Sequence, residues 1–147
     1  MMRWWDIARL LRIERELFGT DAWTESMFWS ELAQHETRLY LVAEENDEIV
    51  GYGGLYAYGE EAFVQTIAVC ADRQGTGIGT AILEALLADA HRRDVSRIGL
   101  EVRADNAKAQ RLYARYGFEP IARRAGYYQP SNTDAVVMML YVREPAR

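Results

Sequence analysis

Hydrophobic and polar positions along the chain follow helical and strand periodicity in turn. Apolar residues recur at helical spacing in 7–18, from about 24 to 34, after residue 79 and in 106–116. Apolar or alternating runs typical of strands occupy 39–43, 49–56, 63–69, 97–102, 120–128 and 135–142. This order, with hairpin-like strand pairs at both ends, predicts an α/β fold. We expect one mixed, mostly antiparallel sheet of six to seven strands, with helices on both faces.

Polar and glycine residues mark the ends of the predicted helices. Asp6 and Thr24 stand where the first two helices begin, and Asp105 precedes the fourth, so each is expected to cap its helix. Gly117 follows the fourth helix, and the apolar Phe118 after it is typical of a Schellman-type stop. The run 63–69 is mostly apolar, which predicts a central strand.

Composition narrows the class of protein. A chain of 147 residues fits one domain, 1–147, that can bury a core without a metal or disulfide. The single cysteine cannot form a disulfide within the chain, which favours a cytoplasmic location. A net charge of −5 argues against nucleic acid as the main partner. No apolar run reaches the ~20 residues that span a bilayer, so no membrane partner is expected. The sequence leaves the oligomeric state open.

A glycine-rich segment, Gln74 to Gly79, joins the run 63–69 to the third helix. Glycines at such a turn let backbone N–H groups approach an anion at the positive end of the helix dipole, so the segment is a candidate phosphate cradle. It lacks the Gly-Lys-Ser/Thr of a Walker loop, and its glycine spacing differs from the Rossmann pattern Gly-x-Gly-x-x-Gly. A tight turn without a ligand is the alternative at this point.

Glu101, Asn106 and Tyr113 form a second candidate group. In an extended segment, Glu101 projects from the same face as Gly99, where a carboxylate could act as a general base. Asn106 and Tyr113 lie two turns apart on one helix face, and Tyr113 could protonate a leaving thiolate. The alternatives are a solvated Glu101 paired with an arginine, and a core Tyr113 with its hydroxyl at the edge.

The order of these motifs resembles the GNAT superfamily of N-acetyltransferases. The motifs are Gln-x-x-Gly-x-Gly at 74–79, Leu-Glu-Val-Arg-x-x-Asn at 100–106 and Leu-Tyr-x-x-x-Gly-Phe at 112–118. Within the superfamily the chain is most similar to the RimI-type ribosomal-protein alanine N-acetyltransferases, through segments 22–25, 67–69, 123–128 and 134–135. The resemblance covers nearly the whole chain. It implies acetyl-CoA as the acetyl donor and the N-terminal amine of a ribosomal protein as the acceptor.

The resemblance also implies roles for individual residues. Glu101 would be the general base and Tyr113 the general acid, with direct attack of the amine in a ternary complex. The glycine segment would cradle the pyrophosphate, and the backbone of 67–69 would bind the pantetheine arm and the thioester carbonyl. The implied cofactor-binding residues are Ile67, Ala68, Val69, Arg73, Gln74, Gly75, Thr76, Gly77, Ile78, Gly79, Thr80 and Asn106. The implied substrate-binding residues are Trp23, Tyr127 and Tyr128.

Two positions depart from the family pattern. RimI-type loops usually carry a basic residue where this chain has Gly75, and Arg73 is a candidate source of the missing charge. The pair at 70–71 replaces a frequent Asp-Pro, and we see no catalytic reason for that change. The first departure puts the strength of cofactor binding in question.

Other mechanisms and functions compete with this reading. A covalent route through Cys70 would need a nearby base, but His35 and His91 lie on amphipathic helices. The sequence has no His/Cys cluster, so no metal is expected. A small-molecule amine is an alternative acceptor, and a catalytically silent acyl-CoA-binding module is an alternative function. The presence of both Glu101 and Tyr113 argues against the silent module.

Overall fold

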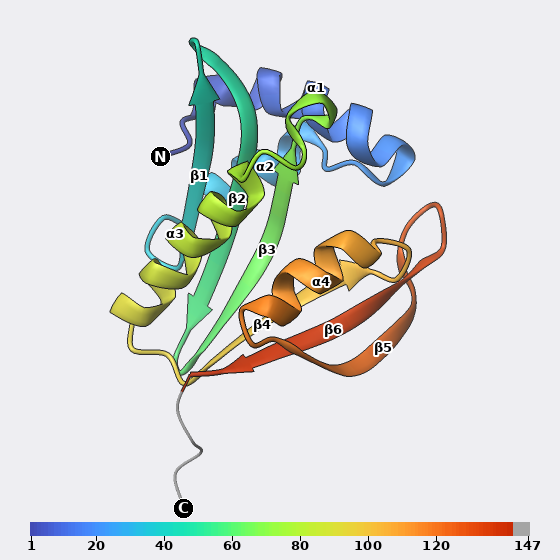
Figure 1. The fold of residues 1–147 in the computed structure, drawn as a ribbon. Coiled ribbons are helices and arrows are strands. Elements are labelled where there is room, and N and C mark those ends of the chain that lie inside the picture. The colour runs from blue at the N-terminus through green and yellow to red at the C-terminus, as the bar shows by residue number, and fades with distance from the viewer. Residues whose placement is uncertain (143–147) are drawn as a thin grey trace, which may run out of the picture.

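Residues 1–142 of the computed structural model are described, and they form a six-stranded sheet with four α-helices (Figure 1). The last five residues of the predicted domain 1–147 lie outside the described part. The elements are η1 (Trp4–Asp6), α1 (Ile7–Phe18), η2 (Gly19–Asp21), α2 (Glu25–Leu32), β1 (Arg38–Glu45), β2 (Glu48–Tyr58), β3 (Glu61–Val69), η3 (Ala71–Arg73), α3 (Ile78–Arg92), β4 (Arg97–Arg103), α4 (Ala107–Arg115), β5 (Glu119–Tyr128) and β6 (Thr133–Tyr141).

The sheet has the strand order β1-β2-β3-β4-β6-β5. β3 and β4 lie at its centre and are parallel, joined by the crossover through α3, whereas every other neighbouring pair is antiparallel. The prediction of a mixed, mostly antiparallel sheet is therefore confirmed, and so is the central position of β3.

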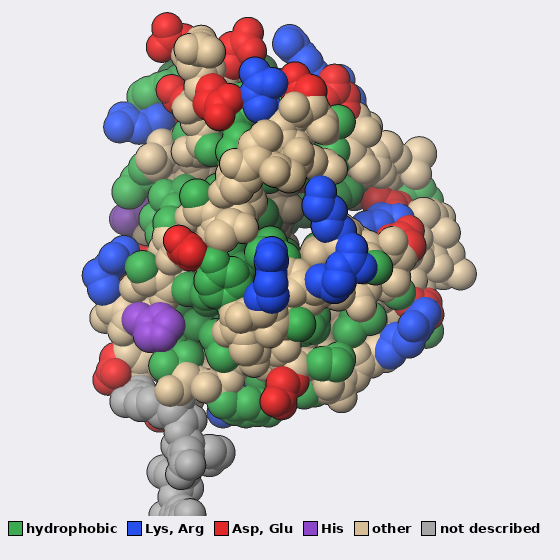
Figure 2. Space-filling view, in the orientation of Figure 1, with side chains coloured by type: hydrophobic (Ala, Val, Ile, Leu, Met, Phe, Trp, Pro, Cys, Tyr) green, Lys and Arg blue, Asp and Glu red, His purple; other side chains and the backbone are tan. Residues whose placement is uncertain are grey.

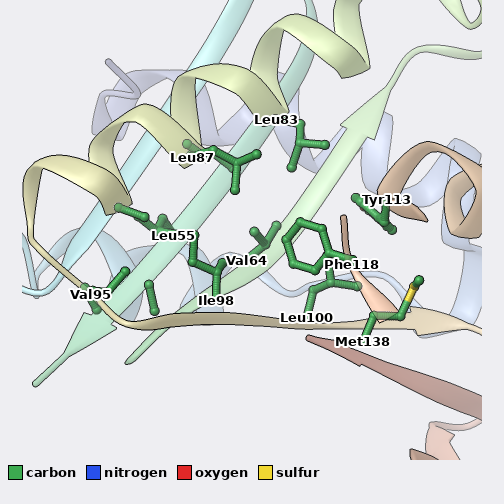
Figure 3. Packing of buried hydrophobic residues seen from close by; sticks show 14 of the residues in the cluster. Leu55, Val64, Leu83, Leu87, Val95, Ile98, Leu100, Tyr113, Phe118 and Met138 are labelled. Carbon is green, nitrogen blue, oxygen red and sulfur yellow. The ribbon is translucent and has the colours of Figure 1, made fainter. Parts of the chain in front are cut away.

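Helices cover both faces of the sheet, as predicted (Figure 1). α3 and α4 lie on one face, where their apolar side chains pack on β2, β3 and β4 (Figure 3). The buried stripe of α3 consists of Ile82, Leu83, Leu86, Leu87 and Ala90. α1 and α2 cover the other face with a second cluster that includes Leu10, Ile13, Phe28, Tyr40 and Tyr52. The sheet thus separates two hydrophobic cores.

Two helix ends follow the sequence signals. The Thr24 hydroxyl accepts a hydrogen bond from the backbone N–H of Met27 at 3.3 Å and so caps α2. At the end of α4, Gly117 has a φ of +95°, and the N–H of Phe118 donates to the carbonyl of Tyr113 at 3.2 Å. This is the six-residue hydrogen bond of a Schellman motif.

Two predicted caps are wrong. Asp6 does not cap α1, because a 3-10 turn precedes the helix and the Asp6 carboxylate accepts the N–H of Arg3 at 2.8 Å instead. Asp105 does not cap α4, because the helix begins one residue later than predicted. Asn106 takes the capping position, and its side-chain oxygen accepts the N–H of Ala109 at 3.0 Å.

Two glycines of β2 allow both helical layers to approach the sheet closely. A Cβ on Gly54 would overlap the buried ring of Tyr40, and a Cβ on Gly53 would overlap the side chain of Ile82 on α3. These glycines lie on opposite faces because neighbouring residues of a strand alternate. Neither position has room for a side chain unless the packed neighbour moves.

We expect Gly54→Ala to lower the free energy of unfolding by about 1–3 kcal/mol, because it overpacks a buried contact. Gly79→Ala is the matched control: its Cβ would lie 3.6 Å from Val69 Cγ2, an ordinary contact at a helical position. That variant should match or slightly exceed the wild type in stability. Urea denaturation measures both, and equal losses would contradict this description of the packing.

Candidate active site

β3 and β4 separate part-way along their length, and this opening organises the site (Figure 1). The strands pair only over residues 61–64 and 97–100. Gln65 is an extra residue in the register of β3 with β2, a bulge at the point where the opening begins. Beyond it, the edge of β3 that faces β4 has no strand partner at 66–69 among residues 1–142. Its backbone N–H and C=O groups can therefore bind an extended ligand.

The glycine segment follows β3 and leads into α3 at the wide end of this opening. Gly77, the N-cap residue of α3, has a φ of +92° and provides no side-chain cap. The first N–H groups of α3 therefore remain available to an anion. Side chains of the segment bond back to the protein: Gln74 Nε2 donates to the Val69 carbonyl at 3.2 Å, and Thr76 Oγ1 donates to the Arg73 carbonyl at 2.5 Å. This geometry suits a phosphate cradle.

Three cavities follow one another along the opening, and the inner one shares lining residues with each of the other two. Their volumes are about 1070 Å³ for the outer cavity, about 140 Å³ for the inner cavity and about 420 Å³ for the loop-side cavity. Outer and inner cavities share Asp21, Trp23, Val64, Gln65, Leu100, Glu101 and Tyr128. Inner and loop-side cavities share Phe18, Ile67, Arg103 and Asn106. Two molecules that enter from opposite ends would therefore meet in the inner cavity.

Many of the predicted site residues line these cavities. Ile67, Ala68, Val69, Gln74 and Asn106 line the loop-side cavity. Trp23, Tyr127 and Tyr128 line the outer cavity with Glu101. Glu101 and Tyr113 both line the inner cavity. The structure therefore brings the two candidate catalytic residues to the place where the cavities meet.

Glu101 lies between the outer and inner cavities with 26% of its side chain exposed. Arg124 Nη1 donates to its Oε1 at 2.5 Å, and the Tyr128 hydroxyl donates to its backbone carbonyl at 3.2 Å. The alternative prediction from the sequence is a solvent-exposed Glu101 paired with an arginine. The arginine pair is present, but Glu101 lies in a cavity wall. The pair fixes the position of the carboxylate at the cavity junction, where a proton can reach it directly or through water.

Tyr113 belongs to the core and to the inner cavity at once. Only 8% of the residue is exposed, and its ring meets Phe118 edge-on at a centroid distance of 5.9 Å. Burial raises the pKa of the Tyr113 hydroxyl to about 12. The hydroxyl therefore keeps its proton at neutral pH and can donate it within the cavity.

Aromatic rings form a wall of the outer cavity. The rings of Tyr127 and Tyr128 meet edge-on at 5.0 Å, and the Arg124 guanidinium lies 5.0 Å from the Tyr127 ring centroid. Burial, and then the hydrogen bond to Glu101, raise the pKa of Tyr127 to about 12. Trp23, on the α1–α2 connection, lines the same cavity. Aromatic walls of this kind suit the apolar and polar parts of a peptide.

Asp21 is a site residue that the sequence analysis missed. Its side chain is 3% exposed, and its carboxylate accepts hydrogen bonds from Arg103 Nη1 at 2.7 Å and the Ser131 N–H at 3.0 Å. The Ser131 hydroxyl also donates to it. Bonds from Ser131 and Arg103 lower the pKa of Asp21 to about 2. Asp21 thus ties the α1–α2 connection to β4 and to the β5–β6 loop, contacts that no local sequence signal reveals.

Glu14 is the second site residue that was missed. It is 1% exposed, lines the inner cavity and accepts hydrogen bonds from the Tyr52 hydroxyl and from the Trp23 N–H, the latter at 3.0 Å. Burial raises its pKa to about 7, partly opposed by the Trp23 bond. A signal was available, because Glu14 lies four residues after Leu10 and belongs to the buried stripe of α1.

The alternative chemistry finds no support in the geometry. Burial, followed by the charges of Asp72 and Glu16, raises the pKa of the Cys70 thiol, which disfavours the nucleophilic thiolate. The thiol donates to the Ile49 carbonyl at 3.8 Å, and Cys70 lines none of the three cavities. Within residues 1–142, no three His, Cys, Asp or Glu side chains are placed to hold a metal ion. No helix in the same range has the length and apolar composition to cross a membrane.

Known proteins resemble the chain over most of its length. The model of the acetyltransferase (GNAT) family matches residues 4–118. A Mycobacterium tuberculosis protein named N-alpha-acetyltransferase RimI is 38% identical over 141 residues, which cover 90% of this chain and 85% of that protein. The Escherichia coli ribosomal protein bS18-alanine N-acetyltransferase is 35% identical over 120 residues, 80% of each chain. The crystal structure of that Escherichia coli enzyme superposes with a TM-score of 0.84 at 31% identity, covering 99% of this chain and 94% of that one.

Glu14 makes stability depend on pH. Its pKa is about 7 in the folded chain, well above the ordinary value of 4.5, so the folded state binds more protons between these values. Its contribution to stability is full below pH 4.5 and declines as the pH rises through 7. We expect Glu14 to lower the unfolding free energy by about 2 kcal/mol from pH 5 to 8.

The comparison of Glu14→Gln with the wild type isolates this contribution. Urea denaturation at several pH values should show a smaller decline from pH 5 to 8 in Glu14→Gln. Glu16→Gln, an exposed position on the same helix, should retain the wild-type decline. An unchanged decline in Glu14→Gln would show that this carboxyl does not carry the effect.

Proposed function

The chain belongs to the acetyltransferase (GNAT) family and is an acetyl-CoA-dependent N-acetyltransferase, and we propose that its acceptor is the N-terminal α-amine of a protein. The acceptor named for the Escherichia coli relative, a ribosomal protein with an alanine terminus, is the specific candidate. The observation that carries the proposal is the row of connected cavities, in which Glu101 and Tyr113 lie where acceptor and donor would meet. A ribosomal acceptor and the single cysteine are both consistent with the cytoplasm.

The residues at the opening fit acetyl-CoA. The unpaired edge of β3 at 67–69 would bind the amide groups of the pantetheine arm, and Asn106 lies beside it in the loop-side cavity. The free N–H groups at the start of α3 would hold the pyrophosphate, and nothing lies within 4 Å of the Cβ position of Gly77. When bound, the cofactor supplies a thioester as the acetyl donor.

Glu101 and Tyr113 would move the two protons of the reaction. An α-amine has an ordinary pKa near 8, so a fraction of it is neutral at neutral pH and can attack the thioester carbon. As the new C–N bond forms, Glu101 would accept the proton that the nitrogen loses, directly or through one water. Backbone N–H groups of 67–69 would face the carbonyl oxygen as it gains negative charge. Tyr113, protonated at neutral pH, would donate its proton to the departing sulfur.

The outer cavity favours a peptide acceptor over a small amine. Its volume of about 1070 Å³ exceeds what a small amine would fill. Its lining includes residues of α2, the α1–α2 connection and β5 together with strands β2, β3, β4 and β6, and Asp21 ties two of the bordering loops together. A pre-formed, aromatic-lined cavity of this size suits several residues of an extended chain end.

The acceptor class is tested by coenzyme A release with acetyl-CoA and a panel of acceptors. The panel holds short peptides with free N-termini, the same peptides with blocked N-termini, and small amines. We expect turnover on free peptides that begin with alanine and none on blocked peptides. Turnover confined to small amines would overturn the proposed acceptor.

The two catalytic roles are tested with Glu101→Gln and Tyr113→Phe. We expect each to lower kcat by about 10²-fold or more, the contribution typical of general acid–base catalysis. Tyr116→Phe at the C-cap of the same helix, whose hydroxyl donates to Glu84 at 2.6 Å, and Glu119→Gln are matched controls that should stay near wild type. Wild-type kcat in Glu101→Gln or Tyr113→Phe would remove that residue from the mechanism.

A further inference from the structure

The proposed phosphate cradle, residues 74–79, contains no Lys or Arg side chain. Backbone N–H groups donate hydrogen bonds to a pyrophosphate, but they bring no net charge against its two negative charges. At position 75 the segment carries glycine, which leaves this part of the loop without a basic side chain. A cation must therefore come from elsewhere if ion pairing is to add to the binding.

Arg73, the expected substitute, is already engaged. Its Nε lies 2.8 Å from a carboxylate oxygen of Glu45, and its Nη1 lies 3.4 Å from Asp72. Two carboxylates face one guanidinium, so this side of the cradle has a net negative charge. Moving Arg73 to a phosphate would leave both carboxylates unpaired.

Lys108 lies on the other side of the cradle. It is the only lysine of the chain and the second residue of α4. Its Nζ lies 3.9 Å from the position that a Cβ on Gly75 would occupy. It is exposed and forms no hydrogen bond or ion pair with the described residues. In Figure 2, basic side chains lie beside the hollow between α3 and α4, on the α4 side.

We propose that Lys108 binds the pyrophosphate of coenzyme A and replaces the basic loop residue that this chain lacks at Gly75. The proposal rests on the assignment of the glycine segment as the phosphate cradle. Lys108 reaches the cradle from α4, whereas the N–H groups come from α3, so the phosphates are held from both sides of the opening. Gly75 serves this arrangement, because its lack of a side chain leaves space in front of the ammonium group.

Binding measurements test the proposal without reference to turnover. Isothermal titration gives the Kd of coenzyme A and of 3′-dephospho-coenzyme A for the wild type, Lys108→Gln, Lys108→Arg and Arg115→Gln. We expect Lys108→Gln to raise both Kd values about tenfold, the loss of one charge-assisted contact. Lys108→Arg should restore most of the affinity. Arg115→Gln, the same change of charge on the same helix, should bind as the wild type does.

Salt dependence separates an ion pair from a structural effect. The affinity of the wild type for coenzyme A should fall more steeply with ionic strength than that of Lys108→Gln, because only the former loses a screened ion pair. Equal slopes would contradict the proposal.

Other outcomes overturn it as well. An unchanged Kd in Lys108→Gln would refute the role of the lysine while leaving the proposed function intact. A weaker affinity for coenzyme A alone, with dephospho-coenzyme A unaffected, would place the ammonium at the 3′-phosphate instead. A wild type that binds neither compound would overturn this inference together with the assignment of the cradle.

Discussion

Parallel pairing between β3 and β4 stops after Val64 and Leu100, although both strands continue beyond these residues. A strand edge inside a protein carries N–H and C=O groups that require partners, and burying them unpaired is costly. The bulge at Gln65 sets where the separation begins. The position of the cavities, the access to the glycine segment and the presence of both Glu101 and Tyr113 in the lining of the inner cavity all follow from this one separation.

The two halves of the sheet must stay apart at one end and together at the other. At the closed end, α3 packs on β2, β3 and β4 through a buried cluster that includes Leu55, Ile98 and Leu83 (Figure 3). At the open end, Asp21 bridges the α1–α2 connection to Arg103 and Ser131. Apolar packing therefore holds the strands together at the closed end, and polar contacts border the cavities at the open end. The backbone edge of β3 stays accessible between them.

Much of this fold could be predicted from local patterns. The limits of α1 agree with the apolar spacing that ends at Gly19, and the predicted stripe of α3 is the buried one. The helix caps follow local patterns less closely: Asp6 and Asp105 do not cap α1 and α4, because an added turn or a one-residue shift changes which side chain reaches the N–H groups. Such shifts cost little energy and leave no pattern in the sequence.

Some residues of the site could likewise be predicted from local patterns, and others could not. Motif spacing led to Glu101, Tyr113 and the glycine segment, because the residues of each motif lie close together in the chain. The contacts of Asp21 and Arg124 could not be predicted from motif spacing. Their partners are distant in the sequence and reach them only when the sheet forms. Glu14 could have been found from its place on the apolar side of α1, where a buried carboxyl is unusual.

We propose that acetyl-CoA lies along the unpaired edge of β3, with its pyrophosphate in the glycine cradle. Amide hydrogen exchange with and without coenzyme A tests it most directly, since a ligand that binds those N–H groups slows their exchange. We expect slower exchange in 66–69 and 74–80, with β1 at the sheet edge unchanged. Protection confined to other segments, with 66–69 exchanging as in the free protein, would contradict it.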